Sequence, residues 1–276
     1  MRPELALPLA LAMTVAASRS DAQIPELGRG KTIDVIDDEH DTRHFDEAST
    51  GRLFVPHEAL GARDVARPLV VFLHGVNPDH TRFRFVGGKP DEPDVRIIIA
   101  RLVARGVVPP LVLGAPTTIV ACEIPVAMWP SFDLDRFVDR TVRALRPVAS
   151  IDLDRVVVVG HSGAGCNATG GLMSAVAGTS LHLRGVMSID TCMAESDARL
   201  ASLVAPDTDL VVTWQPLTWT RPFDAFSAIV RASSEGVPAR RLLEEFRPPT
   251  HTHAHNAMVE LTLEKHLAAV LGTSPK

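Results

Sequence analysis

A serine in a glycine-rich turn is the residue of this chain best placed for nucleophilic chemistry. Four consecutive valines, Val156–Val159, are followed by Gly160-His161-Ser162-Gly163-Ala164-Gly165. We interpret this segment as a G-x-S-x-G turn between a buried strand and a helix of small residues. Its outer glycines, Gly160 and Gly165 (or Gly163), stand where larger side chains would collide with neighbouring elements. Such a turn holds the serine hydroxyl at the carboxyl end of a sheet and at a helix N-terminus, so Ser162 is the predicted nucleophile rather than part of an ordinary glycine-rich turn.

A serine hydroxyl needs a base to remove its proton, and a segment near the C-terminus offers three histidines. His251, His253 and His255 alternate within residues 250–256. His255 directly precedes Asn256, the predicted N-cap of the last helix, so it is the first candidate and His253 the second. The alternation is also compatible with a metal site, but no carboxylates or thiols at matching spacing accompany it. We therefore expect neither a bound metal nor a cofactor.

The acid that orients the histidine has two candidates. Asp190 follows a predicted strand at residues 183–189 and so lies at the carboxyl edge of the sheet, where the sites of open α/β sheets gather. The next predicted strand, residues 209–214, has no acid at its end, and Asp224 comes ten positions later. Asp190 is favoured and Asp224 remains the alternative. A helix cap or a structural ion pair would also explain Asp190.

Acyl transfer also requires hydrogen-bond donors for an oxyanion. The backbone N–H of Gly163, directly after the nucleophile, is the first expected donor. The second is expected in the loop after the apolar run that ends at His74-Gly75, at Val76 or Asn77. We expect His74 to shape this loop and not to act as a base.

These residues need a scaffold, and the hydrophobic pattern predicts alternating strands and helices. Continuous apolar runs favour buried strands, whereas apolar residues three or four positions apart favour helices. Alternating elements of this kind predict a mainly parallel central sheet with helices on both faces, and the interval between the last two strands is too short for a large lid domain. The predicted strands are residues 51–56, 68–75, 111–113, 156–159, 183–189 and 209–214; the predicted helices are residues 95–103, 134–145, one after Ser162 and one from Asn256.

Residues 52–271 resemble the α/β-hydrolase superfamily. Within them, Arg52-Leu-Phe-Val-Pro56 followed by Pro68-Leu-Val-Val-Phe-Leu-His-Gly75 is similar to exported polyhydroxyalkanoate-depolymerase and feruloyl-esterase-like enzymes. The resemblance implies the α/β-hydrolase fold and the chain order serine, acid, histidine for the triad. The chain departs from the usual pattern because no acid ends residues 209–214. It also has Gly-Val-Asn after His74 instead of a glycine run, which disfavours the hormone-sensitive-lipase-like branch.

Together these features predict a serine hydrolase that cleaves small or polymeric carboxylic esters through an acyl-enzyme intermediate. The alternatives are a peptidase or amidase with the same triad and a catalytically inactive binding protein of the same fold. Four aromatic residues near the expected carboxyl edge could line an acyl pocket or pack in the core: Trp129, Phe132, Trp214 and Trp219.

The first residues predict export. Arg2 precedes an apolar run from Leu5 to Ala17, and small residues follow up to Ala22, as in a secretory signal peptide; a buried N-terminal helix is the alternative. The run is too short for a comfortable membrane span. We expect residues 1–22 to be a signal peptide, residues 23–276 to form one domain, and the protein to be secreted or periplasmic with no stable membrane span. The net charge of −5 without a basic tract disfavours a nucleic-acid partner.

Three cysteines permit one disulfide and one free thiol in an oxidising compartment. The expected strand order places the strand of Ser162 beside the strand of Asp190. Cys166 and Cys192 are therefore the pair expected within disulfide reach, and Cys122 the free thiol. Two buried thiols would explain Cys166 and Cys192 almost as well.

Overall fold

The computed structural model describes residues 27, 30–35, 50–61, 64–217, 223–248 and 253–273. The predicted signal peptide, residues 1–22, lies outside this part of the chain, as do His251 and Trp219. Within the described ranges, no helix combines the length and the apolar character needed to cross a bilayer.

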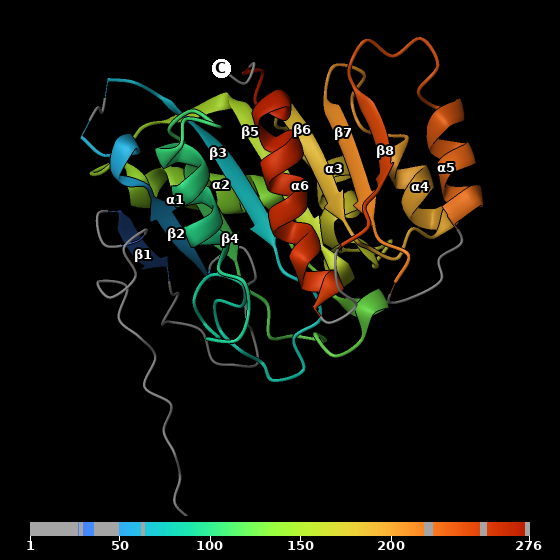
Figure 1. Ribbon diagram of the computed structural model, residues 1–276, viewed down its shortest axis with the longest axis horizontal. Coiled ribbons are helices and arrows are strands. Elements are labelled where there is room, and N and C mark those ends of the chain that lie inside the picture. Colours follow the sequence, from blue (N-terminus) through green and yellow to red (C-terminus); the bar gives the residue numbers. More distant parts are fainter. Residues whose placement is uncertain are drawn as a thin grey trace, which may run out of the picture.

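An eight-stranded sheet forms the centre of the molecule, in the order β1-β2-β4-β3-β5-β6-β7-β8 (Figure 1). Strand β2 pairs antiparallel with β1 and with β4, and every other neighbouring pair is parallel. The strands are β1 (Lys31–Val35), β2 (Gly51–Val55), β3 (Arg67–Leu73), β4 (Val112–Pro116), β5 (Ile151–His161), β6 (Leu183–Ile189), β7 (Asp209–Trp214) and β8 (Arg241–Glu245).

Helices cover both faces of this sheet. Apolar residues of α1 (Val95–Ala104) and α6 (Ala254–Val270) belong to the core on one face, the face turned to the viewer in Figure 1. The core on the opposite face contains residues of four further helices: α2 (Leu134–Leu145), α3 (Gly171–Gly178), α4 (Glu195–Ala201) and α5 (Phe223–Ala232). The predicted architecture, a mainly parallel sheet between two helical layers, is therefore correct.

The four valines of β5 show why this strand has no polar alternation. Val156 and Val158 pack in the core beneath α2–α5, whereas Val157 and Val159 pack beneath α1 and α6. Successive side chains of a strand point to opposite faces, and here both faces are covered. The continuous apolar run is thus the signature of a central strand, and it places the following serine at the middle of the sheet.

Several element bounds agree with the sequence pattern. Strands β6 and β7 and helix α2 have the predicted ends, and α1 begins after Asp94, whose side chain accepts a hydrogen bond from Arg96 N. The predicted cap of the last helix is wrong. Helix α6 begins at Ala254, two residues before Asn256, and its N-cap is His253 in the left-handed region with φ 61°.

Among the described strands and α-helices, four were not predicted: β1, β8, α4 and α5. Strands β1 and β8 are the two edges of the sheet, and their sequences KTIDV and RLLEE are largely half-buried and mix polar with apolar residues. An edge strand is covered incompletely, so its hydrophobic pattern is weak. Helix α4 has only seven residues, which is too short for a clear helical period.

Candidate active site

Ser162 begins a short 3₁₀ turn, Ser162–Gly165, at the carboxyl end of β5. Its φ of 57° is in the left-handed region, which a non-glycine residue adopts at a conformational cost. A side chain on Gly75 would bring its Cβ within 2.9 Å of Ser162 Oγ, so the backbone after β3 lies directly against the hydroxyl. The sharp turn predicted around Ser162 is therefore present, and only glycine fits at position 75.

The glycines around Ser162 have separate neighbours. A Cβ on Gly160 would lie 2.8 Å from the Leu172 side chain, and one on Gly165 would lie 2.5 Å from the Thr191 side chain. Ala164, which is fully buried, occupies the last position of the strict G-x-S-x-G pattern. The motif is therefore G-x-S-x-A, a variant in which Ala164 replaces the second glycine of the pattern. Gly165 lies one residue further on, where it packs against Thr191 of the neighbouring loop.

Asp190 and His255 meet at the same edge of the sheet. In the β5–β6 pairing His161 is opposite Ile189, so Ser162 and Asp190 leave their strands at the same level. Asp190 has no exposed surface, and its Oδ2 lies 2.5 Å from His255 Nδ1 at the start of α6. Asp190 also has a positive φ, 51°, as Ser162 does. A carboxylate that accepts from Nδ1 selects the tautomer in which Nε2 can act as a base.

The other candidate acid and the other described histidine have different positions. Asp224 lies in the first turn of α5, where its backbone carbonyl accepts a hydrogen bond from the Ser227 hydroxyl. His253 is exposed and caps α6. In the described ranges, no group of three or more His, Cys, Asp and Glu side chains is placed to hold a metal ion.

The two expected oxyanion donors, Gly163 and Val76, are neighbours. A Cβ on Gly163 would lie 3.1 Å from Val76 N. Within the described part of the chain, neither of these two backbone N–H groups has a backbone acceptor. Asn77, the other expected position, donates its N–H to Cys122 O at 2.8 Å. Asn77 N–H is therefore used within the loop, and Val76 N–H remains the candidate for the second donor.

His74 holds the loop after β3 from inside. Its Nδ1 lies 2.8 Å from Gly75 O, and its Nε2 lies 3.2 Å from Thr118 N, which requires the neutral ring with a proton on Nδ1. Burial lowers the pKa of His74 to about 4, which agrees with a neutral ring. Trp129 is fully buried and donates from Nε1 to His74 O at 2.9 Å. His74 and Trp129 thus pack together as supports of the loop, with their ring centroids 4.9 Å apart.

The remaining aromatic candidates also pack against neighbours. Phe132 contacts the Trp129 ring edge-on, with centroids 5.4 Å apart, and Trp214 stacks on Phe223 with centroids 3.8 Å apart. Trp129, Phe132 and Trp214 all belong to the core beneath α2–α5. These contacts favour the core-packing explanation for the three residues.

His161, which lies next to Ser162 in the chain, has a role that was not predicted. The ring is buried, its Nε2 lies 3.1 Å from His255 O, and the two imidazole centroids are 4.5 Å apart. Burial and the neighbouring His255 hold the pKa of His161 well below its usual range. A neutral His161 donates from Nε2 to the His255 carbonyl and so fixes the backbone that carries the candidate base. Its position inside the serine motif was the available signal.

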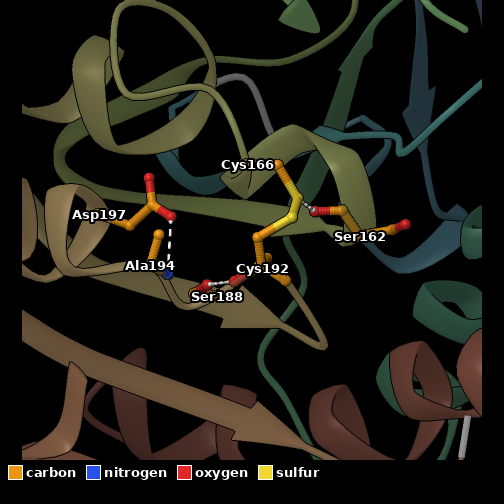
Figure 2. Close-up of a disulfide and its surroundings, with 7 residues drawn as sticks. Ser162, Cys166, Ser188, Cys192, Ala194 and Asp197 are labelled. Atoms are coloured by element: carbon orange, nitrogen blue, oxygen red, sulfur yellow. Dashed lines mark hydrogen bonds between the residues drawn. A yellow bond between two sulfur atoms is a disulfide. The ribbon is translucent and has the colours of Figure 1, made fainter. Parts of the chain in front are cut away.

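A disulfide joins the two loops of the site, as Figure 2 shows. Cys166 and Cys192 are bonded, with Cα atoms 5.0 Å apart, and Cys122 is a buried thiol outside the disulfide. The predicted pairing is confirmed. Cys166 Sγ also lies 3.5 Å from Ser162 O, so the bridge contacts the backbone of the candidate nucleophile.

Comparison with known proteins supports the fold. Neither a protein-family model nor a curated protein sequence matches the chain. A solved ferulic acid esterase matches with TM-score 0.60 and 14% identity over 88% of this chain and 98% of its own. An S-formylglutathione hydrolase from Agrobacterium tumefaciens matches with TM-score 0.56 and 10% identity over 88% and 94%. An acylaminoacyl peptidase from Pyrococcus horikoshii matches with TM-score 0.51 and 11% identity over 87% and 41%. The predicted α/β-hydrolase fold is confirmed.

Proposed function

We propose that this chain is a serine hydrolase that cleaves carboxylic esters with Ser162, His255 and Asp190. The observation that carries the proposal is the 2.5 Å contact between His255 Nδ1 and buried Asp190 Oδ2. Asp190 follows the strand end next to that of Ser162, whose backbone is left-handed. Strained backbone at a polar site of this composition is typical of catalytic centres. The ferulic acid esterase and the S-formylglutathione hydrolase that share the fold support the reaction class.

In the proposed mechanism, Ser162 Oγ attacks the ester carbonyl carbon while His255 Nε2 takes the hydroxyl proton. The proton then passes from His255 to the departing alkoxide, which leaves an acyl group on Ser162. Water attacks this acyl-enzyme through the same base and releases the acid. Asp190 keeps the imidazole oriented and stabilises its cationic form in both halves.

The backbone N–H groups of Gly163 and Val76 are the proposed oxyanion hole. They belong to two different loops that contact each other, and the negative charge on the carbonyl oxygen develops between them. The Asn77–Cys122 hydrogen bond and the buried His74 hold the Val76 loop in place. Donors fixed before the reaction cost no reorganisation when the charge forms.

We further propose export, with residues 1–22 as signal peptide and a secreted or periplasmic mature protein. The disulfide supports an oxidising compartment, because bonds of this kind are rare in the reducing cytosol. The proposed substrates are small or polymeric esters, with no cofactor.

Labelling with a serine-directed fluorophosphonate tests the proposal directly. The wild type should react at one residue and Ser162→Ala should not, whereas Ser227→Ala, a control in α5, should label fully. A series of p-nitrophenyl esters and matched p-nitroanilides then separates an esterase from an amidase. Faster turnover of the anilides would favour the peptidase alternative, and a folded wild type that neither labels nor turns over esters would favour an inactive binding protein.

A further inference from the structure

Gln215 follows β7 directly and takes the place where the resembled superfamily carries an acid. In the β6–β7 pairing Ile189 is opposite Thr213, so the residues after both strands lie at the same edge of the sheet. Asp190 N donates to Thr213 O at 2.7 Å, which ties the two strand ends together. Gln215 and Asp190 are both fully buried.

Two hydrogen bonds run from Gln215 to the Asp190 carboxylate. The side chain donates from Nε2 to Oδ2 at 2.8 Å, and the backbone N donates to Oδ1 at 3.2 Å. Oδ2 is also the oxygen that accepts from His255 Nδ1. Gln215 therefore holds both oxygens of the carboxylate, including the oxygen that accepts from the candidate base.

The orientation of the Gln215 amide is determined by its other end. Its Oε1 accepts a hydrogen bond from Leu217 N at 2.7 Å, so Nε2 must face Asp190. A glutamate at this position would place a second carboxylate against Asp190, and an asparagine would be one methylene too short. The site thus requires the length and the donor of glutamine.

We infer that Gln215 is a positioning residue, which holds the Asp190 carboxylate in line with His255 so that the histidine can act as a base. The inference rests on the proposed function. A buried carboxylate needs donors in place of water, and a missing donor leaves it poorly compensated or rotated away from the imidazole. Two imidazole rings also lie near this carboxylate: His255 on α6 and neutral His161 on β5.

Gln215→Met tests this role, because methionine retains the side-chain length and removes the donor. We expect kcat on an ester to fall about 10- to 100-fold, the effect of losing one hydrogen bond to a charged group, with KM within about twofold of wild type. In the Asp190→Asn background the same substitution should cost little, because the carboxylate it supports is absent. A purely structural role would instead reduce both backgrounds equally.

Thr208→Val is the matched control. Thr208 is buried at the other end of the same two strands, and its hydroxyl donates to Leu183 O at 2.7 Å. This variant loses a buried hydrogen bond, so its stability should fall while kcat remains at the wild-type value. Gln215→Met with wild-type kcat, or with an equal loss in the Asp190→Asn background, would overturn the inference.

Two further measurements keep the inference separate from folding and from the proposed function. The downfield NMR resonance of the His255 Nδ1 proton should shift in Gln215→Met and remain in Thr208→Val, whether or not the protein turns over esters. An unchanged resonance in Gln215→Met would refute the inference.

If Gln215→Met does not fold, Gln215→Glu replaces it. In Gln215→Glu two buried carboxylates share a proton, which is lost at high pH. This loss should lower kcat and the intensity of the His255 Nδ1 proton resonance at alkaline pH, an effect that the wild type lacks. If Gln215→Glu and wild type have the same pH dependence of kcat and of this resonance, Gln215 is not a positioning residue.

Discussion

Cys166 and Cys192 join the turn of the nucleophile to the loop of the acid. Cys166 is four residues after Ser162, Cys192 is two residues after Asp190, and their disulfide closes a sequence separation of 26 residues. Ser162 and Asp190 are both in the left-handed region of backbone conformation. A covalent link between the two turns therefore resists relaxation of either strained residue.

Replacement of both bridged cysteines by alanine should lower stability and activity together. Loss of a cross-link of this loop length costs about 3.5 kcal/mol of unfolding free energy in the chain-entropy model. We expect a lower urea midpoint and a lower kcat for Cys166→Ala/Cys192→Ala. A thiol reductant should have the same effect on the wild type and none on this variant. Unfolded, unreduced protein should titrate as one thiol, from Cys122; three thiols would show that the bridge does not form.

The two candidate acids can be separated by paired substitutions. Asp190→Asn retains the shape of the side chain but stabilises the wrong imidazole tautomer, so kcat should fall by up to about 10⁴-fold. Asp224→Asn, in the first turn of α5, should change kcat less than about twofold and lower the melting temperature only slightly. The measurement is ester turnover at constant pH. The reverse ranking of the two variants would require the assignment to be exchanged.

Paired substitutions also separate the two described histidines near the start of α6, His253 and His255. His255→Ala should lower kcat by several orders of magnitude, because Ser162 loses its base. His253→Asn is the control, since asparagine tolerates the left-handed backbone that His253 adopts at the N-cap of α6. This control should retain wild-type kcat and melting temperature. Comparable losses in both variants would mean that the start of α6, and not the imidazole of His255, is what matters.

The fold was predictable from sequence where a strand or helix is buried uniformly. Residues 183–189 and 209–214 are central strands covered on both faces, and their apolar runs end where the strands end. The edge strands β1 and β8 mix exposed and half-buried residues, so their sequences have no clear hydrophobic pattern.

The candidate site was predictable in its three proposed triad residues and in its two candidate oxyanion donors, Gly163 and Val76. Ser162, Asp190 and His255 follow from residue type, order and position at element ends, and the structure brings Asp190 against His255. Gln215 was missed because a buried amide has no motif of its own, and His161 was missed although it lies inside the serine motif. Their roles depend on the register of β7 and β5 with β6, which fixes what lies beside Asp190.

Asp197, in the first turn of α4, is a buried acid near the disulfide loop (Figure 2). Its Oδ2 accepts a hydrogen bond from Ala194 N at 3.1 Å, and its Oδ1 has no hydrogen-bond partner in the described structure. Burial raises the pKa of Asp197 to about 6, although the Ala194 N–H acts in the opposite direction. The native state therefore prefers the protonated form more strongly than the unfolded state does.

The sign of the pH dependence follows from this difference. Between about pH 4 and pH 6 the native protein holds a proton on Asp197 that the unfolded chain has lost, so this residue's contribution to stability falls as pH rises through that range and stays low above it. Asp197→Asn retains an acceptor for Ala194 N and removes the charge. The variant should be about 1–2 kcal/mol more stable than wild type at pH 7.5, less than the full pKa difference implies because the amide nitrogen finds no acceptor. Urea unfolding from pH 4 to pH 8 measures the gap, which should close toward pH 4; a gap that is constant with pH would show that Asp197 titrates normally.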